Sequence, residues 1–104
     1  MNQELTLATD LGTYLADGSR AAEYRLQRIE PILGVYDLVI LDLEDVRGMN
    51  SSFANALLVP LIVNHGQEVL QKLRFRHCKP VVKLMIEAAL AMGVRSVAAN
   101  AAHA

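Results

Sequence analysis

The sequence has little of what marks several classes of protein. It contains a single cysteine, Cys78, which excludes a disulfide framework and favours a reducing compartment. It also has no excess of positive charge, because 10 Lys and Arg residues are matched by 11 Asp and Glu residues, for a net charge of −1. This balance argues against a nucleic-acid-binding protein that works through bulk electrostatics.

Long hydrophobic runs are missing as well. The longest, Ala56–Val63, contains Pro60 and is far shorter than the ~20 apolar residues that a membrane span requires. The chain opens with the polar and acidic segment Met1–Glu4, where an export signal would place Lys or Arg before an apolar stretch. We therefore expect a cytoplasmic protein that does not span a membrane.

What the chain does have is apolar content. Hydrophobic residues make up 53% of the 104 residues and charged residues only 20%. The length suits one domain, which we expect over residues 1–104, with a core over about 4–93 and a tail over 94–104. Because so small a domain cannot bury all of its apolar surface, some of that surface is expected to meet a protein partner or a second copy in a homodimer.

Apolar periodicity predicts alternating strands and helices. The expected strands cover 38–43 and 73–77, and residues 1–15 form either one strand, over 4–9, or a hairpin with a second strand over 13–15. The expected helices cover 20–34, 51–64 and 80–93, with a helical turn over 67–72. Such alternation predicts an α/β fold with at least one pair of parallel strands. Both faces of 38–43 are apolar, which indicates an interior strand with layers on both sides.

Two residues are expected to interrupt the helices. Pro60 lies within the second helix, where proline cannot donate to the carbonyl of Ala56 and costs ~3 kcal/mol. We therefore expect a kink at Pro60 or a helix end near Val59. Gly93 follows the apolar stripe of the last helix and is expected to end it, which leaves the tail frayed.

The segment from Asp37 to Leu58 carries the candidate site. A buried strand ends in an acidic turn, which leads to Asn50, Ser51 and Ser52 at the start of an apolar helix. Hydroxyls just past the carboxyl end of a strand lie where α/β domains usually place their functional groups, and the helix dipole favours a negative charge there. Either Asn50 or Ser51 is therefore simply the N-cap of this helix, or the serine pair is also a phosphate acceptor or a nucleophile.

A nucleophilic serine would require a histidine base and an oriented acid. His65 lies at the far end of the same helix, and His103 lies in the tail. His77 follows a strand and could share an edge of the sheet with Ser51. The serine lacks the Gly-x-Ser-x-Gly elbow, so a small serine-dependent enzyme is the least favoured alternative and we expect no catalysis.

Neither a metal nor another cofactor is expected. The acidic cluster Asp42, Glu44 and Asp45 has no nearby glycine-bounded loop of the kind that holds calcium. The single cysteine and the histidines lack the spacing of a structural zinc site.

Arg74, Arg76 and Lys79 form a basic stripe, which supports nucleic-acid binding as an alternative function. We consider nucleic acid an unlikely partner, because the stripe contains only one aromatic residue, Phe75, and its side chain is expected to face the core. Pairing of the stripe with an acidic partner is a better use of these charges.

Five segments carry a resemblance to a known family: Ser19–Ala22, Val39–Val46, Met49–Leu57, Leu73–Phe75 and Met85–Leu90. Together they resemble the STAS-like domains, which are small relatives of the sulphate-transporter and anti-sigma-factor-antagonist domain. The resemblance covers roughly residues 10–93. It implies a small mixed or parallel sheet with helices packed on at least one face.

The resemblance also implies a function. In the anti-sigma-factor antagonists, an Asp-Ser-Ser-Gly sequence follows the central strand, and its first serine is phosphorylated by a kinase that doubles as the anti-sigma factor. By position, Ser51 corresponds to that serine, Asn50 to the aspartate and Phe53 to the glycine. The resemblance thus implies a non-catalytic signalling module with a protein partner, such as a histidine-kinase-like ATPase or an anti-sigma-like regulator.

The expected partner-binding surface lies around the serine pair, with Ser51 and Ser52 as the candidate phosphorylation sites. A phosphate would add about −1.5 to −2 charges at neutral pH, be favoured by the helix dipole and repel a partner docked against the acidic turn. The expected surface consists of Glu44, Asp45, Arg47, Met49, Asn50, Ser51, Ser52 and Asn55.

Overall fold

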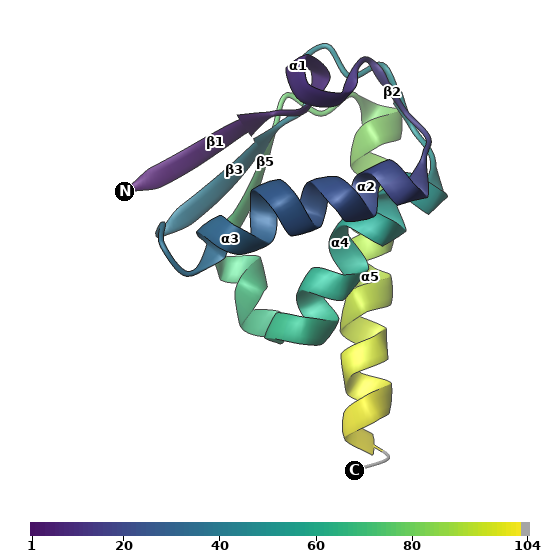
Figure 1. Cartoon of the computed structure of the whole chain (residues 1–104). Coiled ribbons are helices and arrows are strands. Elements are labelled where there is room, and N and C mark those ends of the chain that lie inside the picture. The colour runs from purple at the N-terminus through teal and green to yellow at the C-terminus, as the bar shows by residue number, and fades with distance from the viewer. Residues whose placement is uncertain (103–104) are drawn as a thin grey trace.

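Three parallel strands form the sheet that positions the candidate site. In the computed structural model, which describes residues 1–102, their order is β1 (Asn2–Thr6), β3 (Leu38–Asp42) and β5 (Leu73–Arg76). Helices pack against this sheet (Figure 1), so the predicted α/β fold class is confirmed.

Only one face of the sheet meets the hydrophobic core. Leu5, Leu41 and Phe75 share one row of the register; Leu5 and Leu41 belong to the core, and the half-buried Phe75 packs against it. The next row, Glu4, Ile40 and Arg74, lies on the opposite face, and Glu4 and Arg74 are exposed. Ile40 is buried but lies outside the core cluster. The expected second apolar layer is therefore wrong, and we attribute the burial of Ile40 to the long charged side chains beside it.

The N-terminal region is neither the single strand nor the hairpin expected over the first 15 residues, because β1 pairs with β3 and the next short strand pairs elsewhere. β1 ends at Thr6, and the short helix α1 (Leu7–Leu11) follows because Leu7 is buried and Leu11, four residues on, packs against the same core. Gly12 then closes α1 at a φ of 97°, which glycine adopts readily. Beyond it, β2 (Tyr14–Leu15) pairs in parallel with β4 (Gly48–Met49), a strand that the sequence pattern does not reveal.

A continuous helical segment crosses next to the sheet (Figure 1). It comprises α2 (Gly18–Tyr24), a π-helical turn, η1 (Arg25–Ile29), and α3 (Glu30–Leu33). It begins two residues before the expected start because Asp17 is the N-cap, and its carboxylate accepts from the N–H of Ser19 at 2.9 Å.

Helix α4 (Ser51–His65) runs past Pro60 to its end, so the predicted end near Val59 is wrong. Proline leaves the carbonyl of Ala56 without its helical donor. The Nε of Arg25 supplies a replacement, donating to that carbonyl at 3.1 Å from the neighbouring helical segment. The buried guanidinium is in turn paired with Glu30. A contact between two distant segments thus satisfies the group that Pro60 exposes.

Helix α5 (Pro80–Ala102) packs against α4 and extends past the rest of the molecule toward the C-terminus (Figure 1). The expected end at Gly93 is wrong, and residues 94–102 of the expected tail are helical. A Cβ at Gly93 would lie 2.7 Å from the Cδ1 of Ile62, so glycine here permits a close helix contact. His103, predicted to lie in the tail, is outside the described residues.

The short helix η2 (Gln67–Gln71) links α4 to β5, as the sequence predicts. Among residues 1–102, no helix combines the length and the apolar character needed to cross a membrane.

Candidate functional site

The candidate site is an exposed rim at the start of α4. The chain leaves β3, turns at Asp45, which has a φ of 67°, and passes through β4 before α4 begins. We call this surface the α4 rim; its residues, all exposed, are Glu44, Asp45, Arg47, Asn50, Ser51 and Ser52.

Asn50 fixes the geometry of the rim. Its Oδ1 accepts from the N–H of Phe53 at 2.8 Å, so Asn50 is the N-cap of α4, as the N-cap interpretation expected. Its Nδ2 donates to the carbonyl of Ala16 at 3.0 Å, and its backbone N–H donates to Leu15 at 3.0 Å. An amide side chain accepts through its oxygen and donates through its nitrogen at once, whereas an ionised aspartate can only accept. This is a physical reason for asparagine where the antagonists carry aspartate.

The two serines occupy different environments although both are exposed. A Cβ placed on Gly18 would lie 3.1 Å from the Oγ of Ser52, so Ser52 lies close against the start of α2. Within residues 1–102, neither the hydroxyl of Ser51 nor that of Ser52 makes a hydrogen bond to protein, so the contact with Gly18 is what distinguishes them. Since Asn50 performs the capping, Ser51 is the serine with room for a phosphate at the positive end of the helix dipole.

Two residues of the expected partner-binding surface are not fully exposed. Met49 is 7% exposed because its side chain packs in the hydrophobic core, so we remove it from the surface. Asn55, one turn into α4, is half-buried and lies behind the rim.

Beside the rim, a buried carboxylate holds a histidine. The Oδ1 of Asp42 accepts from the N–H of Glu44 at 3.0 Å and lies 2.8 Å from the Nδ1 of His77. We call this pair the Asp42–His77 clasp; it ties the end of β3 to the loop after β5. The hydrogen bond to His77 holds the pKa of Asp42 below its usual range, and the same bond raises the pKa of His77.

The clasp bears on two interpretations of the sequence. In the described part of the chain, His77 bonds to Asp42 and no hydrogen bond joins it to Ser51. The serine–histidine hydrogen bond that a nucleophilic serine requires is therefore not formed in this structure. Ligand atoms of Asp42, Glu44 and His77 lie within 4.8 Å of one another, which is close enough to hold a divalent cation. Spacing along the chain could not reveal this group, because His77 follows a neighbouring strand.

Stability should depend on pH through the Asp42–His77 clasp. Because folding raises the pKa of His77, its contribution is fully present below about pH 6.5, the usual histidine pKa, and is lost as pH rises through the higher pKa of the folded state. The lowered pKa of Asp42 makes its contribution present above about pH 3.9 and lost as pH falls through the lower folded value.

The variant His77→Asn isolates this effect, since asparagine tolerates the positive φ of 58° at this position and does not titrate. We expect the urea midpoint of the wild type to fall relative to that of His77→Asn between pH 6 and pH 9. Parallel curves for the two proteins would contradict the clasp.

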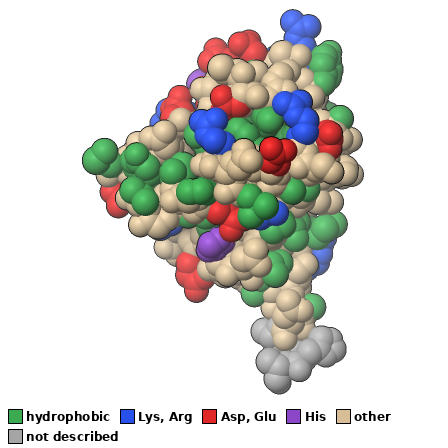
Figure 2. Space-filling view, viewed as in Figure 1, with side chains coloured by type: hydrophobic (Ala, Val, Ile, Leu, Met, Phe, Trp, Pro, Cys, Tyr) green, Lys and Arg blue, Asp and Glu red, His purple; other side chains and the backbone are tan. Residues whose placement is uncertain are grey.

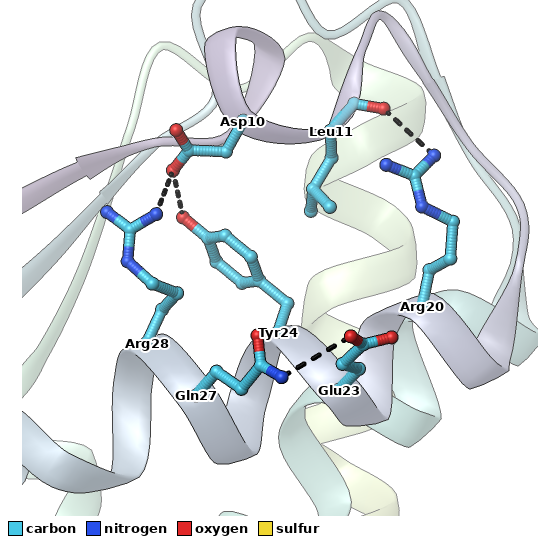
Figure 3. Close-up of a pocket in the computed structure, with 7 residues that line it drawn as sticks. All are labelled: Asp10, Leu11, Arg20, Glu23, Tyr24, Gln27 and Arg28. Carbon is cyan, nitrogen blue, oxygen red and sulfur yellow. Dashed lines mark hydrogen bonds and ion pairs between the residues drawn. The ribbon is translucent and has the colours of Figure 1, made fainter.

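A polar pocket of about 270 Å³ lies between α1 and α2 (Figure 3). The hydroxyl of Tyr24 donates to Asp10 at 2.6 Å, and Arg28 pairs with the same carboxylate at 3.4 Å while its guanidinium lies over the tyrosine ring. Burial, followed by the hydrogen bond to Asp10, raises the pKa of Tyr24. Because these side chains bond to one another, we interpret them as a structural link between α1 and the α2–η1 segment.

Charge is mixed on the molecular surface. Figure 2 shows acidic and basic side chains side by side on the face that carries α1 and α2. The charge of the basic stripe is also partly neutralised, because Arg76 pairs with Glu4 at 3.0 Å across the open face of the sheet. The other two residues of the stripe, Arg74 and Lys79, are exposed.

Comparison with known proteins gives one match. A family model described as a STAS-like domain of unknown function (DUF4325) matches residues 25–83, more than half of the chain. The matched segment runs from η1 to the first turn of α5 and includes the whole α4 rim. Searches of the curated proteins and of the solved structures found no match.

Proposed function

Because this chain belongs to the family of STAS-like domains of unknown function, we propose that it is a non-catalytic protein-interaction module whose partner docks on the α4 rim. The observation that carries the proposal is the exposure of six polar residues between the end of β3 and the first turn of α4, which is capped by Asn50. The hydrogen bonds of Asn50 to Phe53, Ala16 and Leu15 fix the start of α4, so this part of the surface has its geometry set before a partner arrives.

The partner that suits this rim is a protein whose docking surface is basic opposite Glu44 and Asp45 and neutral opposite Ser51. Glu44 and Asp45 are exposed, and among the rim residues only Arg47 is basic. By the resemblance to anti-sigma-factor antagonists, we propose a histidine-kinase-like ATPase or an anti-sigma-like regulator in a cytoplasmic signalling complex. Charge complementarity would contribute mainly to specificity and to the rate of association.

We further propose phosphorylation of Ser51 as the off-switch. In the free protein the α4 dipole would stabilise the phosphate, which carries about −1.5 to −2 charges at neutral pH, whereas docking would bury that charge without a counter-charge. Ser51 supports this role better than Ser52, because the Oγ of Ser52 lies close to Gly18 at the start of α2.

Affinity purification of the tagged protein from its own cell tests the proposal. Ser51→Asp is expected to reduce the recovered partner roughly tenfold, because docking would bury the added carboxylate without a counter-charge. Ser51→Ala should retain the partner. Asn64→Asp is the matched control, because Asn64 is an exposed residue at the other end of α4. Equal recovery with Ser51→Asp and Asn64→Asp would refute the docking site.

A further inference from the structure

The outer edge of β5 carries backbone groups without a strand partner. β5 is the last strand in the order β1-β3-β5, so only one of its edges pairs with β3. On that paired edge, the N–H of Val39 donates to the carbonyl of Lys72 at 2.7 Å. Since the backbone groups of successive residues alternate between the two edges of a strand, those of Leu73 and Phe75 point away from β3.

The backbone groups on this outer edge differ in whether they already have a hydrogen-bond partner. The Nη1 of Arg74 donates to the carbonyl of Leu73 at 2.8 Å, so a side chain covers that acceptor. In the structure of residues 1–102, the N–H and the carbonyl of Phe75 make no hydrogen bond to protein. The edge therefore presents a donor and an acceptor that a further strand could engage.

An apolar hollow adjoins this edge on the core side of the sheet. It has a volume of about 320 Å³ and lies between Phe75 and the first half of α5. Phe75 is only half-buried, because β5 is the edge strand of the sheet and no further strand packs beside it. The lining residues are Phe75, Cys78, Lys83, Ile86, Glu87 and Leu90.

The opposite face of β5 is basic. Arg74 and Arg76 are exposed there, and their side chains lie on the same face because they are two residues apart in a strand. Arg76 pairs with Glu4, whereas the hydrogen bonds of Arg74 go to backbone carbonyls, including that of Gln71 at 3.1 Å. Within the described residues, the guanidinium of Arg74 thus has no carboxylate partner.

We propose that the β5 edge binds an extended peptide segment in which acidic and apolar side chains alternate, as an additional strand of the sheet. Alternate side chains of such a segment point to opposite faces, so its apolar residues enter the hollow beside Phe75 and its carboxylates meet Arg74 and Arg76. A second copy of this chain fits poorly, because antiparallel pairing of β5 with itself would place the arginines of the two copies opposite each other.

A synthetic probe tests the proposal without knowledge of the natural partner. The probe is an acetylated peptide amide of alternating Glu and Val, and the matched control alternates Lys and Val. Amide NMR should show that only the Glu-Val peptide binds, and that hydrogen exchange of the Phe75 amide slows when it does. Absence of binding at millimolar peptide, or binding that leaves the Phe75 amide unchanged, would overturn the proposal.

Charge reversal provides the second arm. Arg74→Glu is expected to weaken binding of the Glu-Val peptide roughly tenfold and to strengthen binding of the Lys-Val peptide, because the pairing on this face is electrostatic. Equal affinities in the variant and the wild type would also overturn the proposal. Ser51→Asp should leave peptide binding unchanged, so the outcome at β5 is independent of the proposed docking on the α4 rim.

Discussion

Replacing Arg25 with methionine should lower the free energy of unfolding by about 3 kcal/mol, within the range for breaking a buried, hydrogen-bonded charge pair. The change leaves two groups without a partner: the carbonyl of Ala56, which Pro60 cannot satisfy, and a carboxylate oxygen of Glu30. Urea denaturation of the variant measures the loss directly.

The same site offers an internal rescue. In the double variant Arg25→Met with Pro60→Ala, residue 60 regains an N–H that can donate to Ala56, so we expect recovery of about 1 kcal/mol, the usual net value of one hydrogen bond. Arg20→Met is the control, because Arg20 is exposed and its change should cost less than about 0.5 kcal/mol. Strictly additive effects of the two substitutions at 25 and 60 would contradict the compensation.

The second large effect is expected where α4 meets α5. Gly93→Val should destabilise the protein by about 1–3 kcal/mol, because a Cβ at residue 93 would lie 2.7 Å from the Cδ1 of Ile62 and 3.1 Å from the Cβ of Ile62. Gly34→Val is the matched control, since a Cβ on Gly34 would have no heavy atom within 4 Å. Thermal or urea unfolding of the two variants supplies the comparison.

A compensating substitution makes this prediction specific to the contact. Ile62→Ala alone should cost about 2–5 kcal/mol through the cavity that it creates, but in the Gly93→Val chain the added side chain occupies part of that space. The double variant should therefore be more stable than the sum of the single effects by roughly 1 kcal/mol. A simple sum would show that the close approach of α4 and α5 does not restrict residue 93.

These two sites also show where sequence reasoning fails for this fold. Pro60 and Gly93 both read locally as interruptions of a helix, and the local cost of each is real. In both cases the reason for the residue is a neighbour distant in the chain: Arg25 replaces the missing donor at Pro60, and Ile62 requires a glycine at 93. Such contacts leave no periodic signal in the sequence.

The order of strands and helices was predictable because it rests on apolar periodicity. The central strand, the helix that begins at Ser51 and the strand that begins at Leu73 all lie where the pattern indicates. The open face of the sheet was not predictable. In the sequence Ile40 has the pattern of a core residue, but we attribute its burial to the long side chains of its neighbours Glu4 and Arg74 on the open face. Burial by charged side chains looks the same in sequence as burial by a second layer.

The candidate site was predictable in its position and less so in its detail. The exposed serines and the cap at Asn50 follow from residue types at a helix start. The burial of Met49 depends on the pairing of β2 with β4, strands too short to produce a pattern. The Asp42–His77 clasp depends on which strands are neighbours, which alternation along the chain does not specify.

The most direct test of the account is hydrogen–deuterium exchange of the protein alone and in the complex recovered from its own cell. The account predicts that slowed exchange on binding concentrates in residues 44–55, which contain the α4 rim, and that it disappears in the Ser51→Asp protein. Slowed exchange confined to other segments, with residues 44–55 as fast as in the free protein, would contradict docking on the rim.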